Sequence, residues 1–252
     1  MGWRTRLQLD ADRAWCILDR LASVAMVAAS ATVLVAAGVL MWPGENVAAD
    51  PLSAGPAAVD QQPVSELLLA SLGTTVKGHE SARLAMIEFS DFQCPYCARY
   101  ATGTHARIER DYVDTGRIKY AFRSMLLDRI HPHAQKAAEA AECAGRQGRF
   151  WDMYDRLFAN QSLLGLAELT GHAQGIGLDR RQFAACLEGE TAAKVSDDRA
   201  EAARLAITST PTFLIGELTP QGEMRVRRRV KGTYPPDVFA AIFDELEGAA
   251  AR

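Results

Sequence analysis

One short stretch of the sequence restricts the fold more than any other: a compact apolar run leads directly into a Cys-x-x-Cys motif. The run is Leu84–Phe89, and Cys94-Pro95-Tyr96-Cys97 follows after four intervening residues. Proline is favoured at the first position of a helix, because its fixed φ suits the helix and it has no N–H to leave unpaired. The pattern predicts a buried strand, a short turn, and a helix that begins at Cys94 and ends near Gly116.

This placement gives the two cysteines different chemistry. The unpaired N–H groups and the positive end of the dipole at a helix start stabilise a thiolate on Cys94 and lower its pKa. Cys97 follows three residues later, where its sulfur can turn back toward Cys94 and close a small ring. We therefore interpret the motif as a redox-active dithiol, with Cys94 as the exposed attacking thiolate and Cys97 as the more buried resolving thiol.

The competing interpretation of a Cys-x-x-Cys motif is half of a metal site. Such a site needs two further soft ligands at suitable spacing. The sequence has no second Cys-x-x-Cys, and the candidate histidine ligands, His131 and His133, flank a proline at a predicted helix start, where surface turn residues are common. We expect no bound metal and no cofactor.

The remaining elements follow from hydrophobic periodicity. Arg117–Phe122 alternates as a second strand, and almost everything from Pro132 to about Ala206 has a helical pattern. Strands are expected again at Thr212–Ile215 and Arg225–Lys231, and a final amphipathic helix opens at Pro235. The resulting order is β-α-β, a helical block, and then α-β-β-α.

That order predicts the α/β class, with a thioredoxin fold split by an inserted α-helical domain. We expect the first part of the thioredoxin fold at residues 72–131, the insertion at 132–190, and the second part at 191–252. Within the insertion, one helical face carries a stripe that we interpret as core and not as a cofactor site: Phe150, Trp151, Tyr154, Leu157 and Phe158.

The N-terminal region predicts a membrane anchor. Residues 21–44 carry no charge, and as a helix these 24 residues would span roughly 36 Å, enough for a hydrocarbon core of about 30 Å. Four arginines precede the segment and three acidic residues follow it, so the positive-inside rule leaves residues 1–20 in the cytoplasm and exports the rest. We assign one transmembrane helix to residues 21–42.

A cleaved signal peptide is the alternative, because Val47-Ala48-Ala49 resembles a small-residue cleavage site. The apolar run is long for a signal core, and about 20 residues precede it, which favours the anchor. Residues 43–71 are rich in Pro, Ala and Gly at their start, and we expect them to form a flexible tether.

The predicted location on either side of the membrane indicates the redox state of the other cysteines. Cys16 lies before the membrane segment and should face the cytoplasm or the interface. Cys143 and Cys186 remain once the redox pair is set aside, and an even remainder in an oxidising compartment favours a structural disulfide. Two buried free thiols are the alternative.

Several phrases of the sequence together resemble the DsbA-like family of thioredoxin-fold oxidoreductases, especially its membrane-anchored relatives. The phrases are Phe89–Cys97, Ala137–Ala144, Gly148–Trp151 and Ser209–Phe213, and the resemblance extends over about residues 72 to 248. It implies a thioredoxin fold with an inserted helical domain and the transfer of disulfides to exported proteins.

The resemblance also implies roles for single residues. Thr210-Pro211 corresponds to the cis-proline step that faces the redox pair across the substrate groove, where the Thr210 backbone can pair with an extended substrate segment. We assign Tyr96 to the same substrate-binding surface. Glu88 corresponds to an acid beneath the redox pair that moves protons to and from Cys97.

One departure from the family pattern concerns the dipeptide between the cysteines. It is Pro-Tyr, whereas the best-known strong oxidants of the family have Pro-His. Tyr96 cannot supply the positive charge that a histidine adds near the thiolate, so we expect a milder potential than that of the strong oxidants.

The sequence therefore predicts a dithiol oxidase, held in the cytoplasmic membrane by a single span, with its catalytic domain on the periplasmic or extracellular side. Its expected partners are exported cysteine-containing proteins and a membrane quinone-linked protein that reoxidises it. An extracytoplasmic reductase and a non-enzymatic metal-binding or chaperone module are the alternatives. The net charge of −3 gives no reason to expect nucleic acid, and we expect a monomer.

Overall fold

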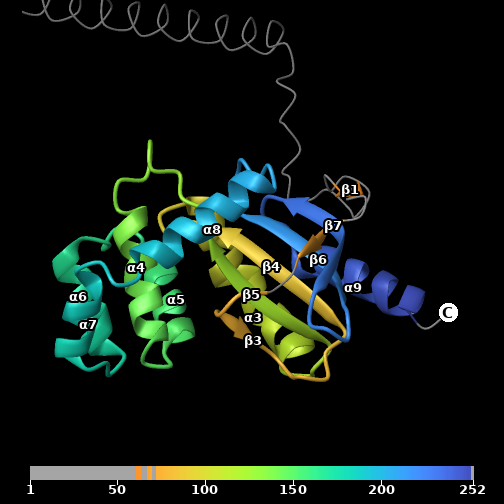
Figure 1. Ribbon diagram of the computed structural model, residues 1–252, viewed down its shortest axis with the longest axis horizontal. Coiled ribbons are helices and arrows are strands. Elements are labelled where there is room, and N and C mark those ends of the chain that lie inside the picture. Colours follow the sequence, from red (N-terminus) through yellow and green to blue (C-terminus); the bar gives the residue numbers. More distant parts are fainter. Residues whose placement is uncertain (1–60, 64–66, 70–71, 251–252) are drawn as a thin grey trace, which may run out of the picture. The chain divides into compact units, whose positions relative to one another are not determined.

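The computed structural model describes residues 61–63, 67–69 and 72–250, and these form a seven-stranded sheet with helices on both faces (Figure 1). The strand order is β1-β7-β6-β4-β5-β3, and β2 also pairs with β7. The strands are β1 (Gln61–Pro63), β2 (Leu68–Leu69), β3 (Val76–Lys77), β4 (Leu84–Ser90), β5 (Ile118–Ser124), β6 (Thr212–Leu218) and β7 (Met224–Lys231).

Strand β4 is the central strand, and every one of its residues is buried. It runs parallel to β5, with Ser90 opposite Ser124, and antiparallel to β6, with Phe89 opposite Thr212. A strand covered on both faces is apolar along its whole length, which explains the compact run in the sequence. The exceptions are Glu88 and Ser90, whose side chains lie on one face of β4 because strand residues two apart point the same way.

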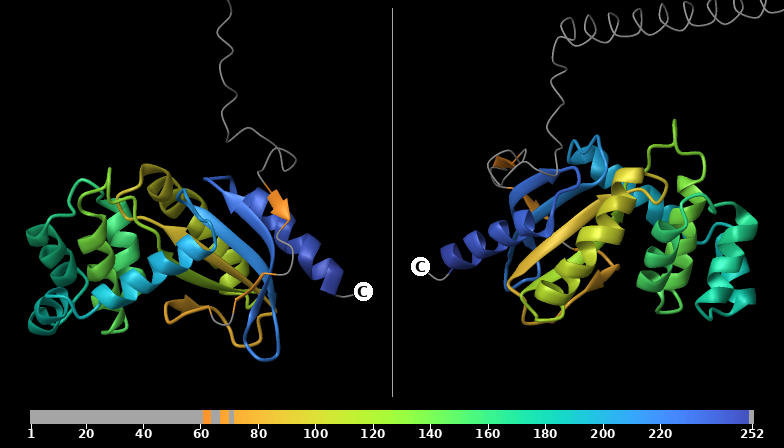
Figure 2. Two further views of the ribbon diagram at one scale, coloured as in Figure 1. Left: turned by 45° about the horizontal axis from the view of Figure 1, so that its top comes forward. Right: turned by 180° about the vertical axis from the view of Figure 1, so that it is seen from behind.

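The two faces of the sheet carry different helices, as Figures 1 and 2 show from opposite sides. One face packs on the helical segment that follows the redox motif and on α9 (Pro236–Ala250), and its core includes Met86, Tyr120 and Phe239. The other face packs on α8 (Ala192–Arg204) through Ile87, Ala121 and Leu214. Glu88 and Ser90 lie on the first face.

The inserted helices form a separate layer beside the end of β4. They are α4 (Ala134–Gly145), α5 (Phe150–Ala159), α6 (Leu166–Gly175) and α7 (Arg180–Leu187). Their shared core is rich in alanine on α4 and in aromatic residues on α5, and it is continuous with Phe92, Cys94 and Cys97. The insertion therefore packs directly against the redox motif.

The helix expected from Cys94 to about Thr115, with Gly116 as its stop, is present as four successive helical segments. They are α2 (Pro95–Arg99), the π-helical η2 (Tyr100–His105), α3 (Ala106–Ile108) and the π-helical η3 (Glu109–Val113). Gly116 then adopts a φ of 76°, a conformation that ends a helix at little cost only for glycine. The widened turns have no signature in hydrophobic periodicity, so the sequence predicts one uniform helix.

Part of the expected tether, residues 43–71, lies in the sheet. Gln61–Pro63 and Leu68–Leu69 pair antiparallel with β7, and they cover a strand edge whose N–H and C=O groups would otherwise be unpaired. The predicted cytoplasmic segment 1–20, the transmembrane helix 21–42 and the rest of the tether up to residue 60 lie outside the described residues. Within the described residues, no helix is long and apolar enough to cross a membrane.

Candidate active site

The redox turn, defined here as residues 91–94, connects the end of β4 to the start of α2. The Cys94 N–H donates to the Asp91 carbonyl at 3.0 Å, and the Asp91 carboxylate accepts from the Gln93 N–H at 2.8 Å. Cys94 is the N-cap residue, with φ −74° and ψ 123°, and Pro95 occupies the first helical position. This is the strand, turn and helix start that the sequence predicts.

Both cysteines are free thiols, and both are buried. Cys94 is 3% exposed and Cys97 is 0% exposed, so the expectation of an openly exposed Cys94 is wrong. Neighbouring segments cover Cys94: its sulfur lies 3.6 Å from the Thr210 carbonyl oxygen, and the Gln161 side-chain amide donates to the Cys94 carbonyl at 2.9 Å. Both residues are therefore shielded from solvent, Cys97 completely.

What separates the two thiols is their electrostatic surroundings. The pKa of Cys94 is lowered from 9.0 to about 6, first by a hydrogen bond from the Cys97 thiol and further by Thr210 and the N–H groups at the helix start, against the opposing effect of burial. The pKa of Cys97 is raised well above 9.0, mainly by burial and then by the adjacent Cys94. At neutral pH the pair therefore holds one thiolate, on Cys94, and one thiol, on Cys97.

The loop before β6 faces this pair. The Thr210-Pro211 peptide bond is cis, and the Thr210 carbonyl is the group that contacts the Cys94 sulfur. The Pro211 carbonyl accepts from the Gly232 N–H at 2.8 Å, which connects the loop to the end of β7. The structure thus brings Thr210 and Pro211 to the redox pair across 116 residues of sequence.

Tyr96 lies in the first turn of α2. Its side chain is 56% exposed, and the Arg99 guanidinium lies 5.5 Å from the centre of its ring. Its carbonyl accepts from the Thr233 hydroxyl at 2.7 Å, so the backbone is held while the ring faces solvent. An exposed ring beside the redox pair offers an apolar surface to another chain.

Glu88 lies in the core beneath the pair. Its Oε2 accepts hydrogen bonds from the hydroxyl groups of Tyr120 at 2.6 Å and Tyr154 at 3.0 Å. Burial raises the pKa of Glu88 from 4.5 to about 7, although both phenols lower it. Such an acid exchanges its proton near neutral pH, and its charge in turn raises the pKa of Cys97.

Three contacts at this site have no signal in the sequence. Tyr154 belongs to the stripe that we interpreted as core, and it is core, but its hydroxyl also binds Glu88. Gln161, in the loop between α5 and α6, donates to the carbonyls of Phe92 and Cys94. His131 contacts the Asp91 carboxylate at 2.8 Å, so it holds the redox turn. Only the tertiary fold brings these residues together.

The second cysteine pair lies in the insertion. Cys143 at the end of α4 and Cys186 at the end of α7 form a disulfide with their Cα atoms 5.8 Å apart. This is the disulfide that the even number of remaining cysteines favours, and it joins α4 to α7.

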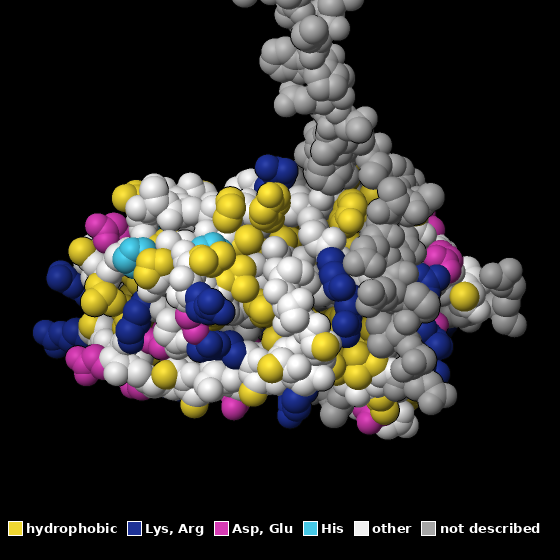
Figure 3. All heavy atoms as spheres, turned by 90° about the horizontal axis from the view of Figure 1, so that it is seen from above, with side chains coloured by type: hydrophobic (Ala, Val, Ile, Leu, Met, Phe, Trp, Pro, Cys, Tyr) yellow, Lys and Arg dark blue, Asp and Glu magenta, His cyan; other side chains and the backbone are white. Residues whose placement is uncertain are grey.

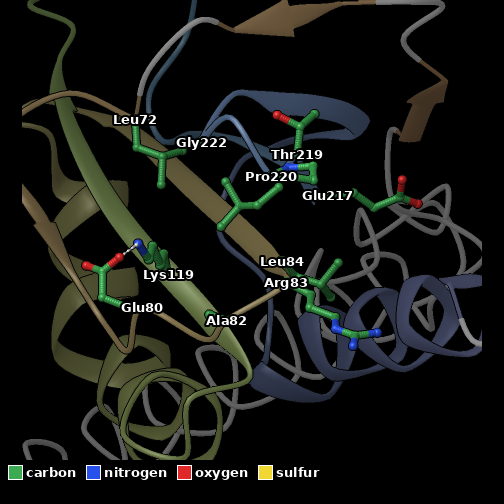
Figure 4. A pocket seen from close by; sticks show the side chains of 11 residues that line it. Leu72, Glu80, Ala82, Arg83, Leu84, Lys119, Glu217, Thr219, Pro220 and Gly222 are labelled. Carbon is green, nitrogen blue, oxygen red and sulfur yellow. Dashed lines mark hydrogen bonds and ion pairs between the residues drawn. The ribbon is translucent and has the colours of Figure 1, made fainter.

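The redox pair does not line the hollow found where β4 begins. Figure 3 shows the face at the top of Figure 1, where apolar and histidine side chains lie close together. A hollow of about 510 Å³ lies instead beside Leu84, where β4 begins, and Glu80 and Lys119 pair across its rim at 3.0 Å (Figure 4). None of the described residues that line this hollow is a cysteine or a histidine. In the part of the chain that the structure describes, no group of three or more His, Cys, Asp or Glu side chains is placed to hold a metal ion.

The chain matches the family model Thioredoxin_4, described as thioredoxin, over residues 70–227. Among solved structures, alpha-DsbA1 of Wolbachia pipientis matches with a TM-score of 0.62 and 24% identity over 70% of this chain and 92% of that one. BdbD of Bacillus subtilis in its oxidised form matches with a TM-score of 0.59 and 21% identity over 73% and 97% of the two chains.

Among curated proteins, the antiporter NhaA 1 of Salinispora arenicola is 35% identical over 179 residues, which are 70% of this chain and 25% of that protein. NhaA of Herminiimonas arsenicoxydans is 33% identical over 170 residues, which are 67% and 25% of the two chains. The chain thus spans about a quarter of the length of the curated relatives that it matches.

The fold, the Cys-x-x-Cys motif at a helix start and the family match together define a thiol–disulfide oxidoreductase. The chain belongs to the thioredoxin family matched here, and within it has the DsbA-like form, in which a helical layer is inserted into the thioredoxin fold.

Proposed function

We propose that this protein is a dithiol oxidase that donates its Cys94–Cys97 disulfide to exported proteins containing reduced cysteines. The observation that carries the proposal is the opposite shift of the two thiol pKa values, that of Cys94 to about 6 and that of Cys97 upward. A stabilised Cys94 thiolate favours the reduced form of the pair, so the disulfide form accepts electrons readily.

The catalytic cycle follows from these positions. A substrate thiolate attacks the Cys94 sulfur of the disulfide, and Cys97 leaves as a thiolate that takes up a proton. A second substrate thiolate then attacks the substrate sulfur of the mixed disulfide and expels Cys94, which is a good leaving group because its pKa is low. We assign the supply of the Cys97 proton to Glu88, whose pKa is about 7.

We assign substrate binding to the loop before β6, which lies opposite the redox pair. The cis step at Thr210-Pro211 holds the Thr210 carbonyl beside the Cys94 sulfur. We propose that an extended substrate segment pairs with the Thr210 backbone and packs on the exposed Tyr96 ring. A segment of a flexible, unfolded protein can adopt this extended conformation more easily than a segment of a folded surface.

The proposal also includes the location. The uncharged segment 21–42, with arginines before it and acidic residues after it, supports a single membrane span with the catalytic domain on the outside. An anchored oxidase would be reoxidised by a quinone-linked membrane protein in the same bilayer. The disulfide between Cys143 and Cys186 is consistent with an oxidising compartment.

The reduction potential of the pair tests the direction of electron flow. We expect a value between about −270 mV, typical of thioredoxin, and about −120 mV, typical of DsbA. The full chain, purified in mild detergent, is equilibrated with glutathione buffers from pH 5 to pH 9. A potential at or below that of thioredoxin would favour the alternative, an extracytoplasmic reductase, for which Tyr96 in place of a histidine is the supporting feature.

The pH dependence of this potential tests the pKa of Cys94. Reduction consumes two protons below pH 6 and one proton above it, because Cys94 then stays a thiolate. The potential should therefore fall by about 59 mV per pH unit below pH 6 and by about 30 mV per unit above it. A constant slope of about 59 mV up to pH 8 would contradict the stabilised thiolate.

A further inference from the structure

Two buried polar atoms beneath the redox pair are unpaired. Within the described residues, Glu88 Oε1 and Ser90 Oγ have no hydrogen-bond partner. A buried polar atom without a partner costs roughly 1–3 kcal/mol, and such atoms are uncommon in folded proteins. An apolar residue at position 90 would avoid this cost, so the hydroxyl calls for another explanation.

Ser90 acts on both the acid and the resolving cysteine. Glu88 and Ser90 are two residues apart on β4 and share a face, and the redox turn begins directly after Ser90. All three of Glu88, Ser90 and Cys97 are completely buried. Burial is the largest influence on the pKa values of the Glu88 carboxyl group and the Cys97 thiol, and it raises both. The Ser90 hydroxyl lowers both pKa values, so this hydroxyl lies near the carboxyl group and near the thiol.

The tyrosines occupy one of the two oxygens of Glu88. Tyr120 and Tyr154 both donate to Oε2, which leaves Oε1 as the oxygen free to carry the exchangeable proton. The Tyr120 hydroxyl also lies 3.3 Å from that of Tyr100. The pKa values of these phenols are raised well above 10 by burial, so the tyrosines orient the carboxyl group and do not release protons at neutral pH.

We propose that the Ser90 hydroxyl relays the proton between Glu88 Oε1 and Cys97 Sγ. The inference rests on the proposed redox function and adds a residue to it. A serine hydroxyl suits this role because it accepts one proton while it donates another, and it carries no charge of its own.

The transfer balances in both directions. When Cys97 leaves the disulfide as a thiolate, Ser90 gives its proton to the sulfur and receives the proton of the neutral Glu88 carboxyl group. When Cys97 attacks a mixed disulfide on Cys94, its proton passes to Ser90, and the Ser90 proton passes to the Glu88 carboxylate. The first direction ends with a thiol and a carboxylate, and the second ends with a new disulfide, a released thiolate and a neutral carboxyl group.

The other groups around Glu88 do not offer the same route. His105 is stacked on Tyr120 at 4.9 Å, and burial lowers the pKa of His105 to about 3, so it is neutral. Lys77 pairs with Glu109 and lies 4.2 Å from the centre of the Trp151 ring. Neither residue is among those that shift the pKa of Cys97. Ser90 is the group that acts on both proton carriers.

The test measures how fast Cys97 resolves a mixed disulfide. The full chain in mild detergent is reduced and mixed with oxidised glutathione in a stopped-flow instrument between pH 6 and pH 9.5. At low glutathione disulfide the rate reports attack by Cys94, and at saturation it reports resolution by Cys97. We expect Ser90→Ala to leave the first rate unchanged and to slow the second about tenfold at pH 7, with the difference closing toward pH 9.5 as hydroxide removes the proton.

Ser124 provides a matched control. It is the pairing partner of Ser90 on β5, it is equally buried, and its hydroxyl also lacks a partner within the described residues. It is not among the groups that shift the pKa of Glu88 or of Cys97. Ser124→Ala should therefore keep the wild-type resolution rate at every pH.

A double variant separates a shared route from two independent effects. If Ser90 acts through Glu88, Ser90→Ala combined with Glu88→Gln should be no slower than Glu88→Gln alone. Wild-type resolution and a wild-type pH profile in Ser90→Ala, or additive losses in the double variant, would overturn the relay. Failure of the wild-type chain to release glutathione at all would instead overturn the proposed redox function.

Discussion

The chain has two pairs of cysteines, the redox pair Cys94 and Cys97 and the insertion pair Cys143 and Cys186. Both pairs are buried, but their positions on the helices and the groups around them differ. All four sulfurs belong to residues that are 5% exposed or less. Cys94 and Cys97 lie at a helix start with N–H groups, Thr210 and Glu88 acting on them. Cys143 and Cys186 lie at helix ends within an apolar core, where the Thr191 hydroxyl is 3.6 Å from the Cys143 sulfur. Burial alone therefore does not distinguish the redox pair from the structural pair, and the difference lies in backbone position and in the neighbouring polar groups.

The comparison also separates two tasks within one fold. The redox pair closes a ring across three residues and changes state during function, whereas the insertion pair closes a loop of 43 residues and constrains the chain. Each task places different demands on its surroundings. The redox pair keeps polar neighbours at a cost in stability, and the insertion pair keeps packed apolar ones.

The largest expected effect is the loss of the attacking thiolate. Cys94→Ser should reduce oxidation of unfolded, reduced proteins at least about a thousandfold, because a hydroxyl neither forms nor leaves a disulfide. The measurement is the rate of thiol loss in a reduced substrate at pH 7. Retention of even a tenth of the activity would contradict the role of Cys94.

Cys97→Ser tests the different roles of the two cysteines within the redox pair. Cys94 can still be joined to a substrate, but the resolving thiol is missing, so covalent mixed disulfides should accumulate. Non-reducing electrophoresis of cells that carry Cys97→Ser or Cys94→Ser measures this. Equal adducts in both variants, or none in either, would mean that Cys94 is not the attacking residue.

The insertion pair should show the opposite behaviour. Replacing Cys143 and Cys186 together by serine should lower the free energy of unfolding by about 4 kcal/mol on the chain-entropy estimate for a 43-residue loop. The rate of disulfide exchange by the folded fraction should stay within about twofold of wild type. Calorimetry measures the free energy of unfolding, and the exchange rate is measured at a temperature at which the wild type and the variant are both folded. Loss of activity with unchanged stability would contradict a structural role for this disulfide.

A smaller effect should come from the buried acid. The pKa of Glu88 is raised in the folded state from 4.5 to about 7, so its charge opposes folding above pH 4.5, with the full cost present above about pH 7. Glu88→Gln removes this cost, and its melting temperature should exceed that of wild type by several degrees at pH 8 and by little at pH 4. Tyr120→Phe serves as the control, since it removes a donor without removing the charge. A larger gain at pH 4 than at pH 8 would contradict the raised pKa.

Much of this architecture was predictable because it depends on local pattern. The apolar run of β4, the proline at the first helical position and the later strands each carry their own signal. The helical layer between β5 and β6 follows from alanine-rich periodicity in the same way. Boundaries were less predictable: β6 continues to Leu218, where Glu217 still pairs with Leu84 in the sheet.

The site was predictable only in part, because part of it is made by tertiary contact. Cys94, Cys97 and Thr210-Pro211 belong to recognisable phrases, and the structure brings them together. The exposure of Cys94 was not predictable, since Gln161 approaches from the insertion. Ser90 also has no signal, because a single serine at the end of a strand looks like a turn residue until its neighbours are known.

The smallest expected effect tests whether charge at the dipeptide tunes the redox pair. Tyr96 is 56% exposed and lies on the first turn after Cys94, so a histidine there would place a cation near the thiolate. Tyr96→His should make the potential about 30 mV more positive at pH 6, a tenfold change for two electrons, because the imidazolium stabilises the reduced form. The shift should fade toward pH 8, where a histidine with an ordinary pKa near 6.5 has lost its charge. Tyr96→Phe keeps the ring without adding charge and should stay within a few millivolts of wild type, so an equal shift in both variants would assign the effect to packing instead.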